Sequence, residues 1–407
     1  MAKYIIIPLL VLILAFRFIT LDKVELKDGQ DLSFSTRLTQ EPNVKNGRKA
    51  FTLFYKGNRI YIIVPGESEY RYGDIISVNG RVGIRLINDK NEFISMYFPK
   101  TEARKDNLAV FFGLRQHIIS VFEKTLPSNY SSLLLGIVFG IKSSMSSNFL
   151  DNLKILGLMH IIAASGMNVT LVAGFLSAIF LLFLKRQIAL ILTIAGIFIY
   201  AFLAGFEPSI VRASIMGMIT FTAQILGRQK LAGYSLFATA YIMIIFSPFV
   251  IWDIGFQLSF VSTAGLIFLR PVLYQIQILK KFFKFIVVGE DVSTTISAQI
   301  ATLPILLANF GLYSIISVVV NAFVLWTIPF IMIIGGVGFL ISIVIEPLGK
   351  PVMYLSIPFL FYFEAVVNIF SIIPGSIESI SPPFVFILGY YLVLLSIISF
   401  AMLKKNE

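Results

Sequence analysis

Hydrophobic and polar positions divide the chain into two parts with different patterns. In residues 21–108, short runs of alternating apolar and polar residues stand between turn signals such as Asn46-Gly47 and Asn79-Gly80, which is typical of β-strands joined by tight turns. From about residue 128 onward, apolar runs of about 20 residues follow one another. A helix of that length crosses the hydrocarbon core of a bilayer. The pattern predicts a small all-β domain followed by an α-helical membrane domain.

The β-domain is expected to contain five strands, at residues 31–39, 50–55, 59–64, 74–83 and 92–98. Five short strands in so few residues are typical of a small barrel. The alternation in residues 72–82 is typical of a central strand of an OB-fold, a five-stranded barrel whose face often holds oligonucleotides. In residues 109–127, apolar and charged residues are interleaved, which predicts an amphipathic helix in the membrane interface.

The helical part is expected to make a polytopic protein with ten spans, the first an uncleaved anchor within residues 1–20, with a signal peptide as the alternative. The ranges are 4–19, 160–184, 188–206, 209–227, 232–250, 252–269, 292–310, 313–345, 352–373 and 384–403. Pro329 interrupts the overlong run 313–345, so two half-length pieces are the alternative there. The apolar pieces 130–141 and 149–158 are each too short to cross, and they predict a re-entrant hairpin within a membrane domain of residues 128–407.

Basic residues set the expected orientation in the cell inner (plasma) membrane. If Lys185 and Arg186 are cytoplasmic, the basic residues that follow every second later span fall on the same side, as far as Lys404 and Lys405. Both termini of the chain are then cytoplasmic, and the β-domain is extracytoplasmic.

Composition supports the membrane class and restricts the chemistry. The chain has 57% hydrophobic residues, 14% charged residues and 39 Phe in 407 residues, which excludes a water-soluble domain of this length. It has no Cys and two His, so neither a thiolate site nor a His-rich metal site is expected. No nucleotide-binding glycine loop or nucleophile motif occurs, and we expect neither an enzyme nor a cofactor. The net charge of +11 suits anionic membrane lipid as well as a polyanionic ligand.

A few polar residues within the apolar runs are candidates for lining a channel or organising helices. They are His160, Ser165, Gly166, Asn168, Glu207, Arg212, Asp253, Gln257, Ser259 and Glu364. A charge at the bilayer centre costs about 2.5–3.5 kcal/mol, so it normally faces a partner or a watery cavity. Ser165 and Asn168 are three apart on one expected helical face, and helix packing is their alternative role. The alternatives are N-capping for Asp253, snorkelling to the surface for Arg212 and a buried structural pair for Glu364.

The β-domain offers basic and aromatic side chains for nucleic acid. The candidate phosphate contacts are Lys45, Arg48, Lys49, Lys56, Arg59, Arg71 and Arg81, with Arg85 nearby, and the candidate stacking rings are Phe51, Phe54, Tyr55 and Tyr61. Residues 21–108 contain 15 Lys and Arg against 12 Asp and Glu. That balance is only weakly basic, so a solvated β-surface is an equal alternative to a nucleic-acid groove.

Four motifs in the helical part resemble, in their order, the signature of the ComEC competence family. They lie at residues 133–140, 157–169, 205–213 and 253–260. The resemblance covers roughly residues 128–400, and the β-domain is similar to the family's OB-like module. It implies an inner-membrane channel that passes single-stranded DNA into the cytoplasm during natural transformation. His160, Ser165 and Gly166 fall on its core motif, Arg212 on the second, and the set Asp253, Gln257 and Ser259 on the third.

The chain also departs from this family in two respects. Asn168 stands where the family often has a second histidine, which speaks against a metal-binding or proton-shuttling pair. Longer members carry a metallo-β-lactamase-like nuclease domain, whereas this chain stops at Glu407 without such a motif. The resemblance therefore implies a separate nuclease, together with a separate DNA receptor and a cytoplasmic helicase or motor. A homo-oligomer is left open.

Two other function classes are compatible with the sequence. One is a transporter or flippase for another anionic, lipid-linked substrate, with Glu364 as a proton-coupled group. The other is an assembly scaffold for partner proteins, in which the polar residues of the spans serve packing alone.

Overall fold

In the computed structural model, the chain forms two compact units, residues 1–124 and 125–407. The described residues are 12–20, 24–38, 42–45, 48–66, 70, 73–88, 91–104, 109–142, 144–163, 165–227, 232–275, 289–310, 312–314, 316–373, 376–378 and 382–406. Of the expected anchor, residues 12–19 are helical. The other residues of the anchor range 4–19 lie outside the described part.

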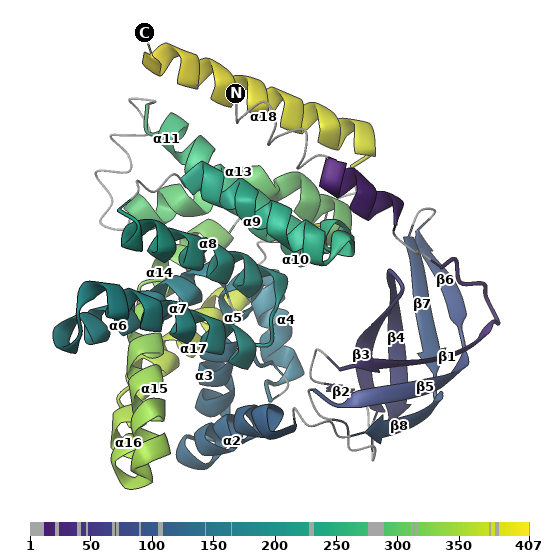
Figure 1. Ribbon diagram of the computed structural model, residues 1–407, viewed down its shortest axis with the longest axis horizontal. Helices are drawn as coiled ribbons and strands as arrows, with labels where there is room; N and C mark the ends of the chain where they lie inside the picture. The colour runs from purple at the N-terminus through teal and green to yellow at the C-terminus, as the bar shows by residue number, and fades with distance from the viewer. Residues whose placement is uncertain are drawn as a thin grey trace. The chain divides into compact units, whose positions relative to one another are not determined.

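The β-domain consists of two sheets (Figure 1). One has the order β1 (Asp31–Arg37), β5 (Ile75–Arg81), β8 (Lys100–Arg104). The other has the order β2 (Asn43–Lys45), β3 (Arg48–Tyr55), β4 (Asn58–Pro65), β7 (Asn91–Tyr97), β6 (Gly83–Asn88). The β4–β7 pair is parallel, and the other pairs within these sheets are antiparallel.

Alternate residues of the strands enter one hydrophobic core, as the period of two along a strand requires. The core contains Leu32, Phe34, Leu38, Phe51, Leu53, Ile60, Ile62, Val64, Ile76, Val78, Val82, Ile94 and Met96. These side chains come from both sheets, so burial of the two inner faces holds the sheets together.

The expected strands are present, but three more occur and one range is wrong. β2, β6 and β8 were not predicted. The expected strand 74–83 continues through Val82, where the chain passes from one sheet to the other. The Val82 amide donates to the Gln30 carbonyl and its own carbonyl accepts from Gly29, both outside the β1–β5 ladder. β6 then pairs with β7 instead of β1. A polarity pattern cannot reveal this change of partner, because the side-chain alternation is uninterrupted.

The helix expected at 109–127 is observed as α2 (Ala109–Thr125), and its position in the membrane interface stays a prediction. The helices of the second unit are α3 (Ser128–Phe139), α4 (Ser147–Ile155), α5 (Met159–Ile162), α6 (Gly166–Phe183), α7 (Arg186–Leu203), α8 (Pro208–Ile225), α9 (Ala232–Phe246), η1 (Pro248–Trp252), α10 (Ile254–Ala264), η2 (Gly265–Leu269), α11 (Arg270–Leu273), α13 (Gly289–Phe310), α14 (Ser317–Val324), α15 (Thr327–Val344), α16 (Glu346–Tyr354), α17 (Ile357–Ser371) and α18 (Phe384–Asn406). Strands β9 (Leu312–Ser314) and β10 (Ser376–Glu378) form a small antiparallel pair.

The expected count of ten spans is not confirmed. Among the described residues, four helices are long and apolar enough to cross a membrane, or up to six if each of two bent pairs is one span. The bent pairs are α14 with α15, at 45°, and α16 with α17, at 41°. The first bend lies within the overlong run 313–345, although it falls before Pro329. The expected span 160–184 also begins later than predicted, at Gly166, because residues 163–165 separate α5 from α6.

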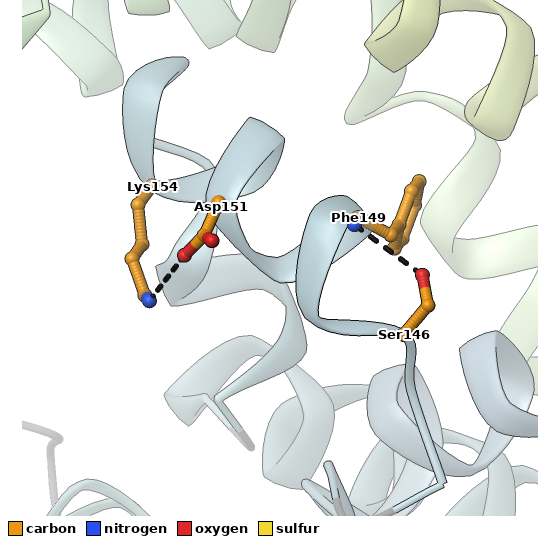
Figure 2. Close-up of polar contacts among 4 residues, drawn as sticks. All are labelled: Ser146, Phe149, Asp151 and Lys154. Atoms are coloured by element: carbon orange, nitrogen blue, oxygen red, sulfur yellow. Dashed lines mark hydrogen bonds and ion pairs between the residues drawn. The ribbon is translucent and has the colours of Figure 1, made fainter. Parts of the chain in front are cut away.

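The two short pieces of the expected hairpin differ in their surroundings. Residues Ser131 to Phe139 of α3 are all buried, whereas Leu153 is the buried residue of α4. Figure 2 shows how α4 begins and what its surface carries: the Ser146 hydroxyl accepts a hydrogen bond from the Phe149 amide at 3.3 Å, and Lys154 pairs with Asp151 at 2.7 Å on the exposed side. An N-cap of this kind satisfies a backbone donor that the first helical turn leaves unpaired. α4 therefore presents a polar face and a narrow apolar one.

Helix α18 completes the backbone hydrogen bonding of α13. Pro304 lies inside α13 and has no N–H to donate to the carbonyl four residues earlier, that of Ile300. The Tyr390 hydroxyl of α18 donates to this carbonyl at 2.8 Å, and the Tyr391 hydroxyl donates to the neighbouring Ala301 carbonyl at 3.0 Å. Two adjacent tyrosines thus satisfy the carbonyls at a proline break.

Tyr390→Phe is expected to destabilise the protein by about 1–3 kcal/mol, because the Ile300 carbonyl then has no donor in an apolar setting. The midpoint of thermal unfolding of the purified protein in detergent measures this loss. In a Pro304→Ala background the effect should shrink, because an alanine supplies the missing amide. Tyr234→Phe, at an exposed position of α9, is the matched control. Equal losses in both backgrounds would show that the Tyr390 hydroxyl does not act on this carbonyl.

Candidate functional site

Residues of the expected core motif meet at the start of α6. Ser165 is the N-cap residue, with extended backbone angles (φ −106°, ψ 168°), so it precedes the helix rather than sharing a helical face with Asn168 as predicted. The two residues nevertheless touch: the Ser165 hydroxyl donates to the Asn168 side-chain carbonyl at 3.0 Å. Asn168 is only 1% exposed, so both of its polar groups need partners inside the protein.

The second partner of Asn168 is the end of α3. Gly140 adopts a left-handed conformation (φ 75°) that only glycine takes readily, and it ends α3. The Gly140 amide donates to the Gly136 carbonyl at 2.9 Å, and the Ile141 amide donates to the Leu135 carbonyl at 3.4 Å. The carbonyls of Ile137 and Val138, in the last turn of α3, accept hydrogen bonds from other helices. The Asn168 amide donates to Ile137 at 2.6 Å, and the Tyr200 hydroxyl of α7 donates to Val138 at 2.6 Å. Side chains from α6 and α7 thus cap a buried helix end.

Arg212 of α8 is turned inward and connects three motifs. Arg212 is only 8% exposed, so its side chain does not snorkel to the surface. Its Nε donates to the Ser259 hydroxyl of α10 at 2.7 Å, and its Nη1 contacts the Met216 sulfur at 3.4 Å. Its Nη2 lies 2.8 Å from the point where a Cβ on Gly166 would stand. The structure therefore brings together Gly166, Arg212 and Ser259, which the sequence places on three separate motifs.

The remaining candidates of the helical unit have other positions. The Asp253 carboxylate accepts from the Phe256 amide at 2.9 Å and caps α10, and the Gln257 amide donates to the Ile251 carbonyl at 2.8 Å. Nδ1 of His160 lies 2.9 Å from the Gly157 carbonyl. These contacts are those of helix ends and turns, which favours an organising role for all three residues.

Two further acidic candidates lie at the start of α8 and within α17. Glu207 precedes Pro208 at the N-cap position of α8 and is half-buried. Glu364 is half-buried in the middle of α17, and no hydrogen bond or ion pair joins it to another described residue. Asn368, one turn further on, is exposed, so the two do not form the buried pair considered as its structural alternative.

The second candidate site is the outer face of the sheet β3–β4–β7–β6, and we call it the aromatic face. It consists of Phe54, Arg59, Tyr61, Arg85, Phe93 and Tyr97. The strand register places them on one side, because Phe54 lies opposite Arg59, Arg85 lies opposite Phe93, and their neighbours Leu53, Ile60 and Ile94 point into the core. The rings of Tyr61 and Phe93 are 5.4 Å apart between centroids.

Guanidinium groups lie over the rings of this face. Arg59 lies 5.3 Å from the centroid of Phe54, and Arg85 lies 5.6 Å from that of Tyr97. Beside the face, Arg48 lies 5.5 Å from the ring of Phe98. The three rings are 46–50% exposed, which leaves them accessible for stacking. Burial lowers the pKa of Arg59, although a guanidinium remains protonated at neutral pH.

Several sequence candidates of the β-domain are not part of the aromatic face. Phe51 is a core residue, and Tyr55 packs on Phe34 with 4.8 Å between ring centroids, so neither is a free stacking surface. Lys56 lies 5.9 Å from the ring of Tyr55 at the β3–β4 turn.

The other basic candidates lie elsewhere. Arg81 is on the other sheet, where it pairs with Asp31 at 3.3 Å. Lys49 lies on β3 two residues before the inward-facing Phe51, so it is on the same side of the strand, and it is half-buried. Lys45 lies in the short strand β2. Arg71 lies outside the described residues. Phe93, Tyr97 and Phe98 were not among the sequence candidates, although the alternation of the expected strand 92–98 was a signal for them.

The described residues contain no group of three or more His, Asp or Glu side chains arranged to hold a metal ion.

Residues 137–404 match the family model described as "Competence protein". The chain is 27% identical over 227 residues to ComE operon protein 3 of Bacillus subtilis (strain 168), a match that covers 56% of this chain and 28% of that protein. It is 26% identical over 347 residues to an uncharacterized protein of Aquifex aeolicus (strain VF5), which covers 82% of this chain and 76% of that protein. No solved structure matches.

Proposed function

Because the chain belongs to the competence protein family, we propose that it takes part in DNA uptake for transformation as a membrane channel component for single-stranded DNA. The name of the relative encoded in a competence operon supports the role in DNA uptake. That relative is much longer than the match, which spans 28% of it, so the activity of the whole relative is carried over only as part of this proposal.

The observation that carries the proposal is the aromatic face. Single strands expose the faces of their bases, and each base that stacks on an aromatic side chain gains about 1–3 kcal/mol. Phe54 and Tyr97 are half-exposed rings with a guanidinium over each. When a base occupies such a ring, the displaced guanidinium is placed to pair with a neighbouring phosphate. The face therefore suits a flexible polyanion with planar side groups better than it suits a folded protein.

The strand pairing supports an OB-like assignment for this domain. A parallel β4–β7 pair within an otherwise antiparallel set, and a chain that crosses between the sheets at Val82, are features of a small Greek-key barrel. OB-folds bind single strands on a sheet face of this kind.

The helical unit supplies the membrane part of the proposed route. Its long apolar helices and the family assignment make the chain a membrane protein. We place it in the plasma membrane as a multi-pass protein, with the β-domain outside and both termini in the cytoplasm. A separate DNA receptor, a nuclease and a cytoplasmic helicase or motor are the partners that this role requires, and the chain itself acts without a catalytic step.

The direct test is binding of a fluorescent single-stranded oligonucleotide to the full chain in nanodiscs. The double variant Phe54→Ala with Tyr97→Ala is expected to bind about 30-fold more weakly or worse, because two stacking surfaces of about 1–3 kcal/mol each are lost. Both rings are half-exposed, so the fold should persist. Arg81→Ala, on the other sheet and paired with Asp31, is the matched control and should bind nearly as the wild type does. Unchanged binding by the double variant would contradict a role of the aromatic face.

A second candidate function is transport of another anionic, lipid-linked substrate. The observation in its favour is Glu364, a half-buried carboxyl in the middle of α17 without a hydrogen-bond or ion-pair partner among the described residues. Such a group in a membrane helix is a candidate proton carrier. Under this alternative, Glu364→Gln abolishes a pH-dependent transport rate while DNA uptake stays normal, whereas the channel proposal expects no such separation.

A further inference from the structure

Phe98 has a backbone conformation that a bulky residue rarely adopts. It follows β7 with a left-handed φ of 50°, where the chain passes to β8 and so from one sheet to the other. The next residue is Pro99, which favours extended angles in the residue before it and so makes this conformation less favourable still. Gly29 and Gly73 supply positive φ at turns of the same domain without steric cost. Strained non-glycine residues are concentrated at functional sites, so the Phe98 side chain is a candidate for a binding role.

The left-handed turn brings the Phe98 ring to the outer side of the sheet. Neighbouring residues of a strand point to opposite sides, and Tyr97 points outward, so an extended Phe98 would point toward the core. Instead, Phe98 is 50% exposed, and the Arg48 guanidinium lies 5.5 Å from the centroid of its ring. Arg48 is six residues before Phe54 on β3 and therefore points to the same side as the aromatic face. Phe98 and Arg48 are thus accessible from that side, and we call this pair the Phe98 subsite.

The Phe98 subsite and the pair formed by Phe54 and Arg59 lie at opposite ends of one sheet face. Phe54 lies opposite Arg59 next to the β3–β4 turn, whereas Arg48 lies opposite Pro65 at the other end of the same two strands. Six residues of extended strand, at about 3.3 Å each, place Arg48 about 20 Å from Phe54. Both ends of the face therefore carry an exposed ring with a guanidinium over it.

Neither member of the Phe98 subsite has a competing partner in the part of the chain that the structure describes. Arg48 is exposed and no carboxylate pairs with it, and no other ring packs on Phe98. Only the weak attraction between a guanidinium and a ring has to be exchanged when a base stacks on Phe98. The released guanidinium then lies beside the base, where it can bind the adjoining phosphate.

We propose that Phe98 and Arg48 bind a second base and its phosphate, so that one DNA strand extends along β3 and β4 from the Phe54 end to the Phe98 end. This proposal rests on the proposed function, and it adds the direction in which the strand lies and a length below which it cannot contact both ends. A strand that instead crossed the β-strands at Phe54 would leave Phe98 without a role in binding. Oligonucleotide length therefore separates the two orientations.

The first experiment compares two lengths of oligonucleotide on the full chain in nanodiscs of zwitterionic lipid. A fluorescent thymidine dodecanucleotide reaches both ends, whereas a thymidine dinucleotide, measured as a competitor, occupies one end at a time. Phe98→Gly is expected to weaken binding of the dodecanucleotide about fivefold or more, because one stacking surface is lost. It should weaken binding of the dinucleotide about twofold at most, because the Phe54 end remains. An equal loss for both lengths, or none for the dodecanucleotide, overturns the proposal.

Phe98→Gly also separates a binding role from a structural one. Glycine adopts a positive φ without strain, so the thermal unfolding midpoint of this variant should not fall. Phe98→Tyr keeps the ring and should bind the dodecanucleotide as the wild type does. A midpoint that falls together with the affinity would show that Phe98 maintains the fold, and it would overturn the subsite.

The contribution of Arg48 is measured from the salt dependence of binding. For single strands, each phosphate contact adds about 0.7 to the slope of log affinity against log salt concentration. Arg48→Gln is therefore expected to reduce the slope for the dodecanucleotide by about 0.7. Arg81→Gln removes the same charge from the other sheet, where Arg81 pairs with Asp31, and should leave the slope unchanged. Equal slopes for the wild type and Arg48→Gln would exclude the phosphate contact and overturn the subsite.

Failure of this inference differs from failure of the proposed function. If Phe98→Gly binds the dodecanucleotide like the wild type while the double variant of Phe54 and Tyr97 binds weakly, the subsite is overturned and the aromatic face stands. If the double variant also binds like the wild type, the proposed function fails as well.

Discussion

Gly349→Ala is expected to destabilise the helical unit by about 3 kcal/mol or more, so that little folded protein is recovered. A Cβ at residue 349 would collide with the Ser342 hydroxyl, and it would stand 2.5 Å from the Ser342 amide nitrogen and 2.6 Å from the Gly338 carbonyl oxygen. Two of these three atoms are backbone atoms of α15, which cannot move without separating α15 from α16. Close approach through small residues is a common way for membrane helices to pack.

The yield of monodisperse protein after detergent extraction and the thermal midpoint together measure this effect. Gly336→Ala is the matched control on α15, because a Cβ there meets nothing within 4 Å. It is expected to be neutral or slightly stabilising, since alanine favours helix over glycine by about 1 kcal/mol. A Gly349→Ala protein with wild-type yield and midpoint would show that α15 and α16 do not pack as closely as described.

Asn168→Leu is expected to destabilise the protein by about 2–4 kcal/mol. Leucine has a similar volume but leaves the buried Ile137 carbonyl and the half-buried Ser165 hydroxyl without their partner, and each unsatisfied buried group costs about 1–3 kcal/mol. The loss should appear as a lower thermal midpoint in detergent. The change also removes the hydrogen bond that joins the start of α6 to α3, so DNA uptake should fall in the same variant.

The controls for this prediction test the two hydrogen bonds. Asn368→Leu alters an exposed asparagine of α17 and should leave the thermal midpoint nearly unchanged. Asn168→His retains a ring N–H that can donate to the Ile137 carbonyl. Its thermal midpoint should therefore fall less than that of Asn168→Leu. If leucine and histidine at this position were equally stable, the hydrogen bond to Ile137 would not contribute.

The class of the protein was readable from its sequence, whereas the ends of its helices were not. Long apolar runs and the order of four motifs predicted a membrane protein of the competence family, and the family match confirms that assignment. Hydropathy did not reveal the break at 163–165, because Ala163 and Ser165 do not lower an apolar average enough. At the break, Ser165 contacts Asn168, and Asn168 in turn contacts Ile137 of α3, which lies 31 residues earlier in the chain.

For the candidate site as well, single residues could be predicted from the sequence, whereas their contacts could not. Ser165, Gly166, Arg212 and Ser259 could be named one by one, but their meeting required the packing of α6, α8 and α10. In the β-domain, composition suggested aromatic residues, yet only the register separates the inward Phe51 from the outward Phe54. Tyr200 was missed because its hydroxyl acts on a carbonyl of α3, 62 residues earlier in the chain.

The proline break of α13 has a consequence for biosynthesis. α18 leaves the ribosome after α13, so the Ile300 and Ala301 carbonyls must await Tyr390 and Tyr391 before they gain these donors. Until then, the proline break leaves the Ile300 carbonyl without the donor that an uninterrupted helix would supply. Premature termination before α18 would leave this carbonyl without its donor, so we expect a chain that lacks α18 to hold α13 less stably.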